Sequence, residues 1–201
     1  EAAKKHIQWL IDCCAAVGSP IVIGPLYQSL GKFSGKGPSE TEMQRITEIL
    51  SELAPKAQEA GVMLVIEAIN RFEAYMCNTL AQATAMAKRV NHPAVGMMVD
   101  TFHCHIEEND PHAAIREAGD AIVHVHFSEN TRGTPGDGQV DFPAVMKTLR
   151  EVGYDGWIVN EVFGRALPDL AAATCIWRDL FESQMQCAIQ AHAYVRGVIN
   201  G

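Results

Sequence analysis

The chain has 201 residues, of which 48% are hydrophobic and 20% are charged, and its formal net charge is −8 at neutral pH. This is the composition of a globular domain and is too apolar for a disordered chain. No uncharged apolar run approaches the roughly 20 residues that a membrane span needs. The negative charge, without a basic cluster, argues against nucleic acid or an anionic membrane as a partner. The six cysteines form no C-x-x-C pair, which favours reduced thiols in a cytoplasmic protein.

Short apolar runs alternate along the chain with longer amphipathic stretches. The apolar runs predict buried strands at 20–24, 62–67, 95–100, 121–127 and 157–161. Helical periodicity predicts helices over 2–17, 39–60, 79–90, from about 110, over 142–152, and in two segments over 168–199. The first turn of the second helix carries Ser39 and, three residues later, Glu42, which suits a capping box. Strands alternating with helices indicate parallel βαβ units within one α/β domain spanning 1–201.

Four predicted strands carry a potential metal ligand at the carboxyl end: Glu67, Asp100, His126 and Glu161. Their spacings are 33, 26 and 35 residues, close to the roughly 31 residues that one strand–helix unit takes in a (β/α)₈ barrel. Equivalent positions on successive strands converge on one face of such a barrel. Three carboxylates and an imidazole gathered there would be stabilised by a cation among them. Oxygen-dominated ligation with one nitrogen favours Mn²⁺, Mg²⁺ or Co²⁺.

The sequence stretches around these four residues identify a protein family more specifically than the four residues alone. They read IEAINRFEAYMCNT (66–79), VDTFHCHIEEND (99–110), HVHFSENTRGTPGDGQVDF (124–142) and GYDGWIVNEVF (153–163). These motifs resemble the ketose 3-epimerase family, typified by D-tagatose 3-epimerase and D-psicose 3-epimerase. That family belongs to the xylose isomerase-like TIM barrels, and the resemblance runs from about residue 20 to about residue 180.

The resemblance implies a metal site made of the same four strand-end residues, usually holding Mn²⁺ and sometimes Co²⁺. It implies that Glu67 and Glu161 are also the catalytic acid and base, on opposite faces of the reacting carbon. Glu73, His103 and Arg132 match positions that contact the oxygens of the sugar. The substrate would be a free ketose, and the full-length protein would be a homo-oligomer.

The implied reaction agrees with the chemistry of these residues. Epimerisation beside a ketone removes a weakly acidic proton from one face of C3 and returns one to the other face. A divalent ion on the carbonyl would stabilise the enediolate as charge develops. Two opposed carboxylates can then exchange the roles of proton donor and acceptor.

Other interpretations remain open at this point. The chain could be another enzyme of the same barrel group, such as a hydroxypyruvate isomerase or an inosose dehydratase, or a non-catalytic truncated barrel. An endonuclease IV-like phosphodiesterase would need more histidine ligands and a basic groove, which the sequence lacks. Glu73 and Arg132 could be solvated loop residues, and His103 could bond loop backbone. Departures from the family pattern at 127–128 and after Glu161 leave the substrate range undetermined.

The number of strands is also informative. Five strands are predicted, whereas a closed barrel has eight, so we expect an incomplete barrel that corresponds to the C-terminal part of the fold. Matching the motifs leaves the first three βα units unrepresented, with residues 2–17 as the end of the third helix. Open sheet edges favour association, so we expect these 201 residues alone to be poorly soluble or inactive.

Overall fold

The computed structural model describes all 201 residues and contains one sheet of five parallel strands. The strands are β1 (Ile21–Gly24), β2 (Met63–Glu67), β3 (Val95–Asp100), β4 (Ile122–Phe127) and β5 (Ile158–Asn160). They follow one another in the order β1-β2-β3-β4-β5, and every pair is parallel. All five predicted strands are confirmed within about two residues. Sequential parallel neighbours are the arrangement of a TIM barrel, here as an open half.

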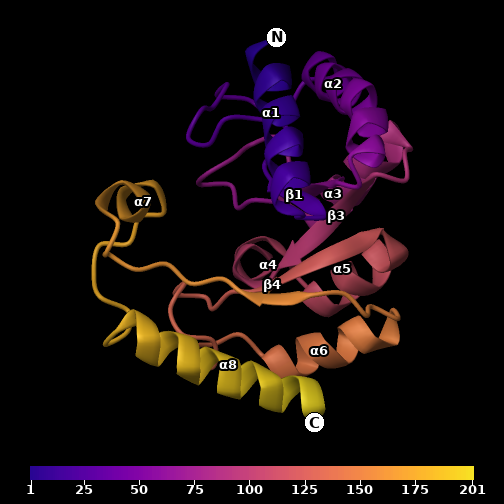
Figure 1. Cartoon of the computed structure of the whole chain (residues 1–201). Helices are drawn as coiled ribbons and strands as arrows, with labels where there is room; N and C mark the ends of the chain where they lie inside the picture. The colour runs from indigo at the N-terminus through magenta and orange to yellow at the C-terminus, as the bar shows by residue number, and fades with distance from the viewer.

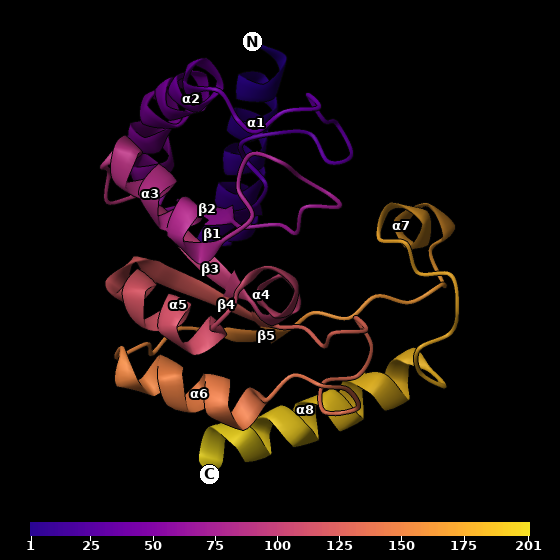
Figure 2. The same ribbon diagram turned by 180° about the vertical axis from the view of Figure 1, so that it is seen from behind.

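Helices connect the strands and form an arc along one side of the sheet, as Figure 2 shows for α2, α3, α5 and α6. The two chain ends lie at opposite ends of the molecule in Figure 1. The helices are α1 (Ala2–Val17), α2 (Glu40–Glu59), α3 (Leu80–Val90), α4 (Thr101–Glu107), α5 (Pro111–Ala118), α6 (Phe142–Glu151), α7 (Pro168–Ala173) and α8 (Gln184–Asn200). A single 3₁₀ turn, Gly119–Ala121, precedes β4. Helix α4 was not predicted, and the other helices agree with the sequence pattern.

Side-chain caps explain where the long helices begin. The Ser39 hydroxyl accepts a hydrogen bond from the Glu42 N–H, and the Glu42 carboxylate accepts one from the Ser39 N–H. Thr79 and Gln82 make the same reciprocal pair at the start of α3. These capping boxes satisfy backbone donors that the first helical turn leaves free. The capping box predicted at Ser39 is therefore confirmed.

The hydrophobic core lies between the sheet and its outer helices. It is a single cluster of 37 buried residues that draws on every strand from β1 to β4. Leu50 and Leu53 of α2 are fully buried against this face of the sheet, as are Leu64 and Ile66 of β2. Strands covered on both faces carry continuous apolar runs rather than alternating ones, and all six residues of β3 are buried.

The two outer strands are less well covered. Strands β1 and β5 each pair with one neighbour only, so the sheet stays open. The side chain of Val159 in β5 is 39% exposed, and Trp157 before it is 77% exposed. The expected incomplete barrel with five parallel strands is confirmed. No helix has the length and apolar composition required to cross a membrane.

Candidate metal centre and sugar site

The four candidate metal ligands lie together at the carboxyl end of the sheet. Glu67 and Asp100 are the last residues of β2 and β3, and His126 is the penultimate residue of β4. Asp100 and His126 are partners in the parallel register. Glu161 directly follows β5 and continues its ladder, because its N–H donates to the carbonyl of Phe127 at 3.1 Å. Parallel strands therefore bring residues from four separate segments to one edge, as the spacing predicts.

Their polar atoms form two overlapping groups that share Asp100. In one group, His126 Nδ1 lies 3.5 Å from Asp100 Oδ2 and 3.3 Å from Glu161 Oε1. In the other, ligand atoms of Glu67, Asp100 and His103 all lie within 4.8 Å of one another. Both groups are suited to a metal ion by the identity and separation of their atoms. His103, expected at the sugar, therefore lies close enough to the carboxylates to act beside them.

Asp100 has a separate role for each carboxylate oxygen. Its Oδ1 accepts hydrogen bonds from the N–H groups of Phe102 at 2.8 Å and His103 at 3.1 Å, so it caps helix α4. Its Oδ2 is buried and has no hydrogen-bond partner within the protein. The strand end thus passes directly into a helix, and this fixes the orientation of the free oxygen. Helix α4 was not predicted because it follows β3 without a loop, with the last residue of the strand, Asp100, as its N-cap.

Burial and mutual charge shift the ionisation of this cluster. Burial, together with the charges of Asp100 and Glu161, raises the pKa of Glu67 to about 8. Burial also disfavours the charged form of Asp100, but the nearby His126, His103 and Arg132 outweigh it and hold its pKa at about 2. Burial lowers the pKa of His126, but the carboxylates of Asp100 and Glu161 raise it by more, to about 10. One carboxyl therefore tends to keep a proton while its neighbours are ionised.

The donor set fits a divalent cation. Asp100 Oδ2 and His126 Nδ1 are both buried and both lack a hydrogen-bond partner in the protein, although buried polar atoms are normally paired. A cation between them would satisfy both atoms and offset the repulsion among the carboxylates. Oxygen ligands with one imidazole suit a hard or borderline divalent ion.

Arg132 lies directly beside the cluster, as predicted for a sugar contact. Its Nη1 donates to Glu161 Oε2 at 3.1 Å, and its Nη2 lies 3.5 Å from Glu73 Oε1 and 3.1 Å from His103 Nε2. Arg132 as a whole is 5% exposed, and its Nε has no partner within the protein. All three predicted sugar contacts, Glu73, His103 and Arg132, are therefore adjacent to one another and to the carboxylates.

A buried asparagine that the sequence did not single out orients two of these residues. The Asn70 N–H donates to His103 Nδ1 at 3.0 Å, and the Asn70 amide donates to Glu73 Oε1 at 2.7 Å. Because Nδ1 accepts a hydrogen bond, neutral His103 carries its proton on Nε2. This nitrogen lies 3.7 Å from Glu67 Oε1, and as a donor it makes no hydrogen bond with the donor Nη2 of Arg132. Burial also lowers the pKa of His103, which favours this neutral form. The signal in the sequence was the asparagine three residues after Glu67 in the stretch 66–79.

Two phenylalanines hold the guanidinium of Arg132. The carbon Cζ lies 4.1 Å from the ring centre of Phe102 and 4.7 Å from that of Phe163, distances typical of cation–π contacts. Phe102 comes from α4 and Phe163 from the segment after β5. Neither was predicted, because their positions in the sequence do not reveal that they meet.

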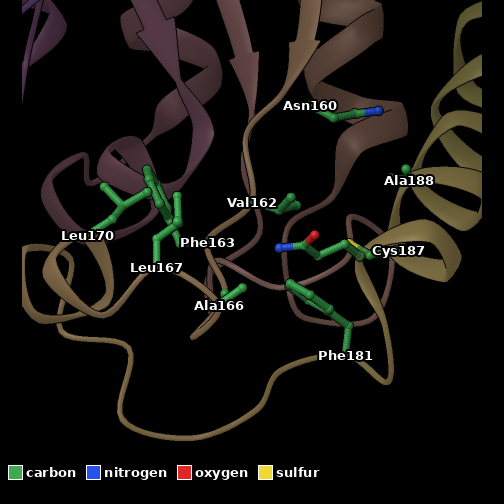
Figure 3. A pocket seen from close by; sticks show the side chains of 12 residues that line it. Asn160, Val162, Phe163, Ala166, Leu167, Leu170, Phe181, Cys187 and Ala188 are labelled. Carbon is green, nitrogen blue, oxygen red and sulfur yellow. The ribbon is translucent and has the colours of Figure 1, made fainter.

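A separate hollow of about 370 Å³ lies on the other side of this segment, between it and α8. Figure 3 shows Phe163 on one side of the hollow, with Leu167 and Leu170, and Cys187 and Ala188 of α8 on the other. Nine of its twelve lining residues are hydrophobic. It therefore offers apolar surface and little of the chemistry that the carboxylate cluster carries.

Comparison with known proteins agrees with this geometry. The family described as Xylose isomerase-like TIM barrel matches residues 1–186. The chain belongs to this family. Among curated relatives, a ketose 3-epimerase of Arthrobacter globiformis is 30% identical over 198 residues, covering 98% of this chain and 68% of its own. An L-ribulose 3-epimerase of Mesorhizobium japonicum is 37% identical over 162 residues, which are 80% of this chain and 54% of its own.

Solved structures of this group have the same fold. An L-ribulose 3-epimerase superposes with a TM-score of 0.94 at 32% identity, covering 98% of this chain and 67% of the other. A D-psicose 3-epimerase of Clostridium cellulolyticum H10, solved with D-tagatose, gives 0.89 at 30% identity, covering 98% and 70%. The chain thus spans about half to two thirds of the length of its relatives. The two curated relatives named above are a ketose 3-epimerase and an L-ribulose 3-epimerase.

Proposed function

We propose that the site catalyses metal-dependent epimerisation of a free ketose at C3. The observation that carries this proposal is that Asp100 joins two groups of possible ligands, one with Glu67 and His103 and one with His126 and Glu161, beside the guanidinium of Arg132. The relatives named as ketose, L-ribulose and D-psicose 3-epimerases support it. We further propose Mn²⁺ as the ion, held by the four strand-end residues, with Co²⁺ or Mg²⁺ as substitutes.

In this proposal the two glutamates carry the proton. Bound to the sugar oxygens, the ion would supply the positive charge that stabilises an enediolate. A carboxyl group beside the reacting carbon, such as that of Glu67, can both take and give a proton. Glu161 is held by the guanidinium of Arg132, which keeps its carboxylate in place. Deprotonation from one face by one glutamate and reprotonation by the other would invert C3.

The neighbouring residues would hold the sugar. The Nε of Arg132 is a buried donor without a partner in the protein, and in this proposal a substrate oxygen would accept its hydrogen bond. The proton that His103 carries on Nε2 faces the same region, and the carboxylate of Glu73 can accept from a sugar hydroxyl. These three residues supply donors and an acceptor around one position, as recognition of a polyol requires.

The proposal is tested by hydrogen exchange at carbon. The full-length protein, loaded with Mn²⁺, is incubated in D₂O with D-psicose, D-tagatose and L-ribulose, and the products are read by NMR. We expect deuterium at C3 and formation of the C3 epimer. Complete absence of deuterium at C3 of every ketose would overturn the proposal. The Glu67→Gln and Glu161→Gln variants should each lose exchange while the protein keeps its fold.

A second candidate reaction is epimerisation at C4 of a 3-keto sugar. A 3-dehydro-D-guloside 4-epimerase of Escherichia coli is 29% identical over 164 residues, which cover 78% of this chain. The same pair of glutamates could act there, because C4 is also adjacent to a ketone. Deuterium at C4 of a 3-keto glucoside, with none at C3 of a ketose, would favour this reaction.

We also propose that the protein acts in a reducing compartment such as the cytoplasm. Its six cysteines are free thiols, and three of them, Cys77, Cys104 and Cys187, are buried. Secreted proteins of this size more often use their cysteines in disulfides.

A further inference from the structure

Glu129 is a fully buried carboxylate outside the cluster of candidate ligands. Its Oε1 accepts hydrogen bonds from the N–H groups of Asn130, Gln139 and Val140 at 2.9, 3.0 and 3.0 Å. Its Oε2 accepts one from the N–H of Gly136 at 3.1 Å. One side chain therefore binds four backbone donors spread over the loop that follows β4. Hydrogen bonds to a charged acceptor are about twice as strong as neutral ones, so this carboxylate organises the loop.

Gly138 lies directly against this carboxylate. A Cβ atom on Gly138 would lie 2.5 Å from Cδ of Glu129 and 2.4 Å from Oδ1 of Asn130, distances at which these groups must move. The backbone of Gly138 is not in the left-handed region, so close approach is what requires glycine here. Glu129 and Gly138 thus form one device, in which the loop closes tightly around the acid.

The loop that this device shapes presents Arg132. The Arg132 N–H donates to the carbonyl of Glu129 at 2.8 Å, and its own carbonyl accepts from the N–H of Phe163 at 3.0 Å. Its φ of +60° is a left-handed conformation that a side-chain-bearing residue rarely adopts. Surrounding contacts must therefore maintain it. The same backbone geometry directs the guanidinium between Phe102 and Phe163.

We propose that Glu129 is a positioning residue whose contact with Gly138 and with four loop N–H groups holds Arg132 in its place between the two phenyl rings. The claim that Arg132 then contacts sugar rests on the proposed function, whereas its positioning does not. Glu129 touches neither the carboxylate cluster nor the guanidinium, so it acts only through the backbone of the loop.

Two variants disturb the contact between Glu129 and Gly138, one by changing each residue. Glu129→Gln keeps the size of the side chain but replaces one acceptor oxygen with an NH₂ group, which cannot accept a backbone N–H. Gly138→Ala keeps the acid and inserts a methyl group against it. Asp137→Asn is the matched control, because it removes a negative charge from an exposed residue of the same loop.

The direct measurement is the NMR signal of the Arg132 Nε–H in the full-length protein, without sugar. Rings on both sides of the guanidinium should shift this signal strongly upfield in the wild type. We expect both Glu129→Gln and Gly138→Ala to move it towards the position of a solvated arginine, and Asp137→Asn to leave it unchanged. Because the two substituted residues are in contact, their effects on the signal should not add in the double variant. Unfolding curves check that each variant is folded.

The second measurement is the apparent affinity for D-psicose in the presence of Mn²⁺. We expect a roughly 10- to 100-fold loss in both variants, the range seen when a group that orients an active residue is removed. An unchanged Arg132 signal in a folded Glu129→Gln or Gly138→Ala protein would overturn the positioning role. If the variants shift the Arg132 signal but the wild type binds no sugar, the positioning role of Glu129 is supported and the proposed function is rejected. If Glu129→Gln does not fold, Gly138→Ala alone decides the question.

Discussion

The central strands and the outer strands of this sheet are built differently. Strands β3 and β4 have a paired neighbour on each side, and every residue of β3 is buried. Strand β5 has three residues and one neighbour, and Val159 at its centre is 39% exposed. The central strands are held by hydrogen bonds to two neighbours and by burial, whereas β5 is hydrogen-bonded to β4 alone.

This difference reaches the candidate metal centre. Glu67, Asp100 and His126 come from the central strands and are buried, but Glu161 follows the exposed strand and its side chain is 21% exposed. Glu161 is instead held by polar contacts, from Arg132 Nη1 at 3.1 Å and to His126 Nδ1 at 3.3 Å. Three ligand positions are therefore set by packing and the fourth by ion pairs.

The largest contrast is expected in metal binding. Asp100→Asn keeps an oxygen that can cap α4 but replaces Oδ2 with an NH₂ donor, which cannot bind a cation. We expect its affinity for Mn²⁺, measured by calorimetry, to fall by more than the roughly 10- to 100-fold typical of groups that only orient ligands. Glu161→Gln should lose less.

The control is Asp110→Asn, which alters an acid that caps α5 and should not change Mn²⁺ binding. Equal losses in Asp100→Asn and Glu161→Gln would show that the central and outer ligands contribute alike.

The rate at which thiols are alkylated should differ between the central core and the exposed outer segments. Burial raises the pKa of Cys77, which packs in the central core, to about 12, whereas Cys175 in the segment after α7 is exposed. A pKa three units above the usual value of about 9 lowers the thiolate fraction at pH 8 roughly a thousandfold. Mass spectrometry after brief alkylation should find Cys175 modified and Cys77 intact, and both modified in urea. Equal rates in the native protein would mean that the centre opens as readily as the outer segments.

Core truncation tests the contrast through stability. Leu64→Ala removes a fully buried side chain of β2 and should lower the free energy of unfolding by about 2–5 kcal/mol. Val159→Ala removes two methyl groups from the exposed strand and should cost within about 0.5 kcal/mol. Urea denaturation followed by circular dichroism measures both. A cost above about 1.5 kcal/mol for Val159→Ala would show that β5 is packed in solution.

Two equivalent helix caps give the smallest and sharpest test. Ser39→Ala and Thr79→Ala each remove the acceptor of a capping box, from α2, which packs against α1 and β2, and from α3, which packs against β3. Each should cost about 1 kcal/mol, and the same transition should shift in both if the molecule unfolds in one step. If α2 and its neighbours unfold separately, Ser39→Ala will shift only an early phase.

Much of the architecture could be predicted from the sequence because local chemistry determined it. Apolar runs set the five strands, and the capping pair at Ser39 and Glu42 set the start of α2. The regular spacing of Glu67, Asp100, His126 and Glu161 predicted that they would meet, since parallel strands end at one edge. Only periodicity and the geometry of a repeating unit were needed for this.

Tertiary structure alone decided how the site is assembled around those residues. Helix α4 begins on Asp100 because a strand end and a helix cap coincide there. Phe102 and Phe163 enclose Arg132 although 61 residues separate them in the chain. Glu129 gathers four backbone donors from a loop with no periodic pattern. Sequence patterns report which residues share a face of one element, but contacts between distant segments arise only when the chain has folded.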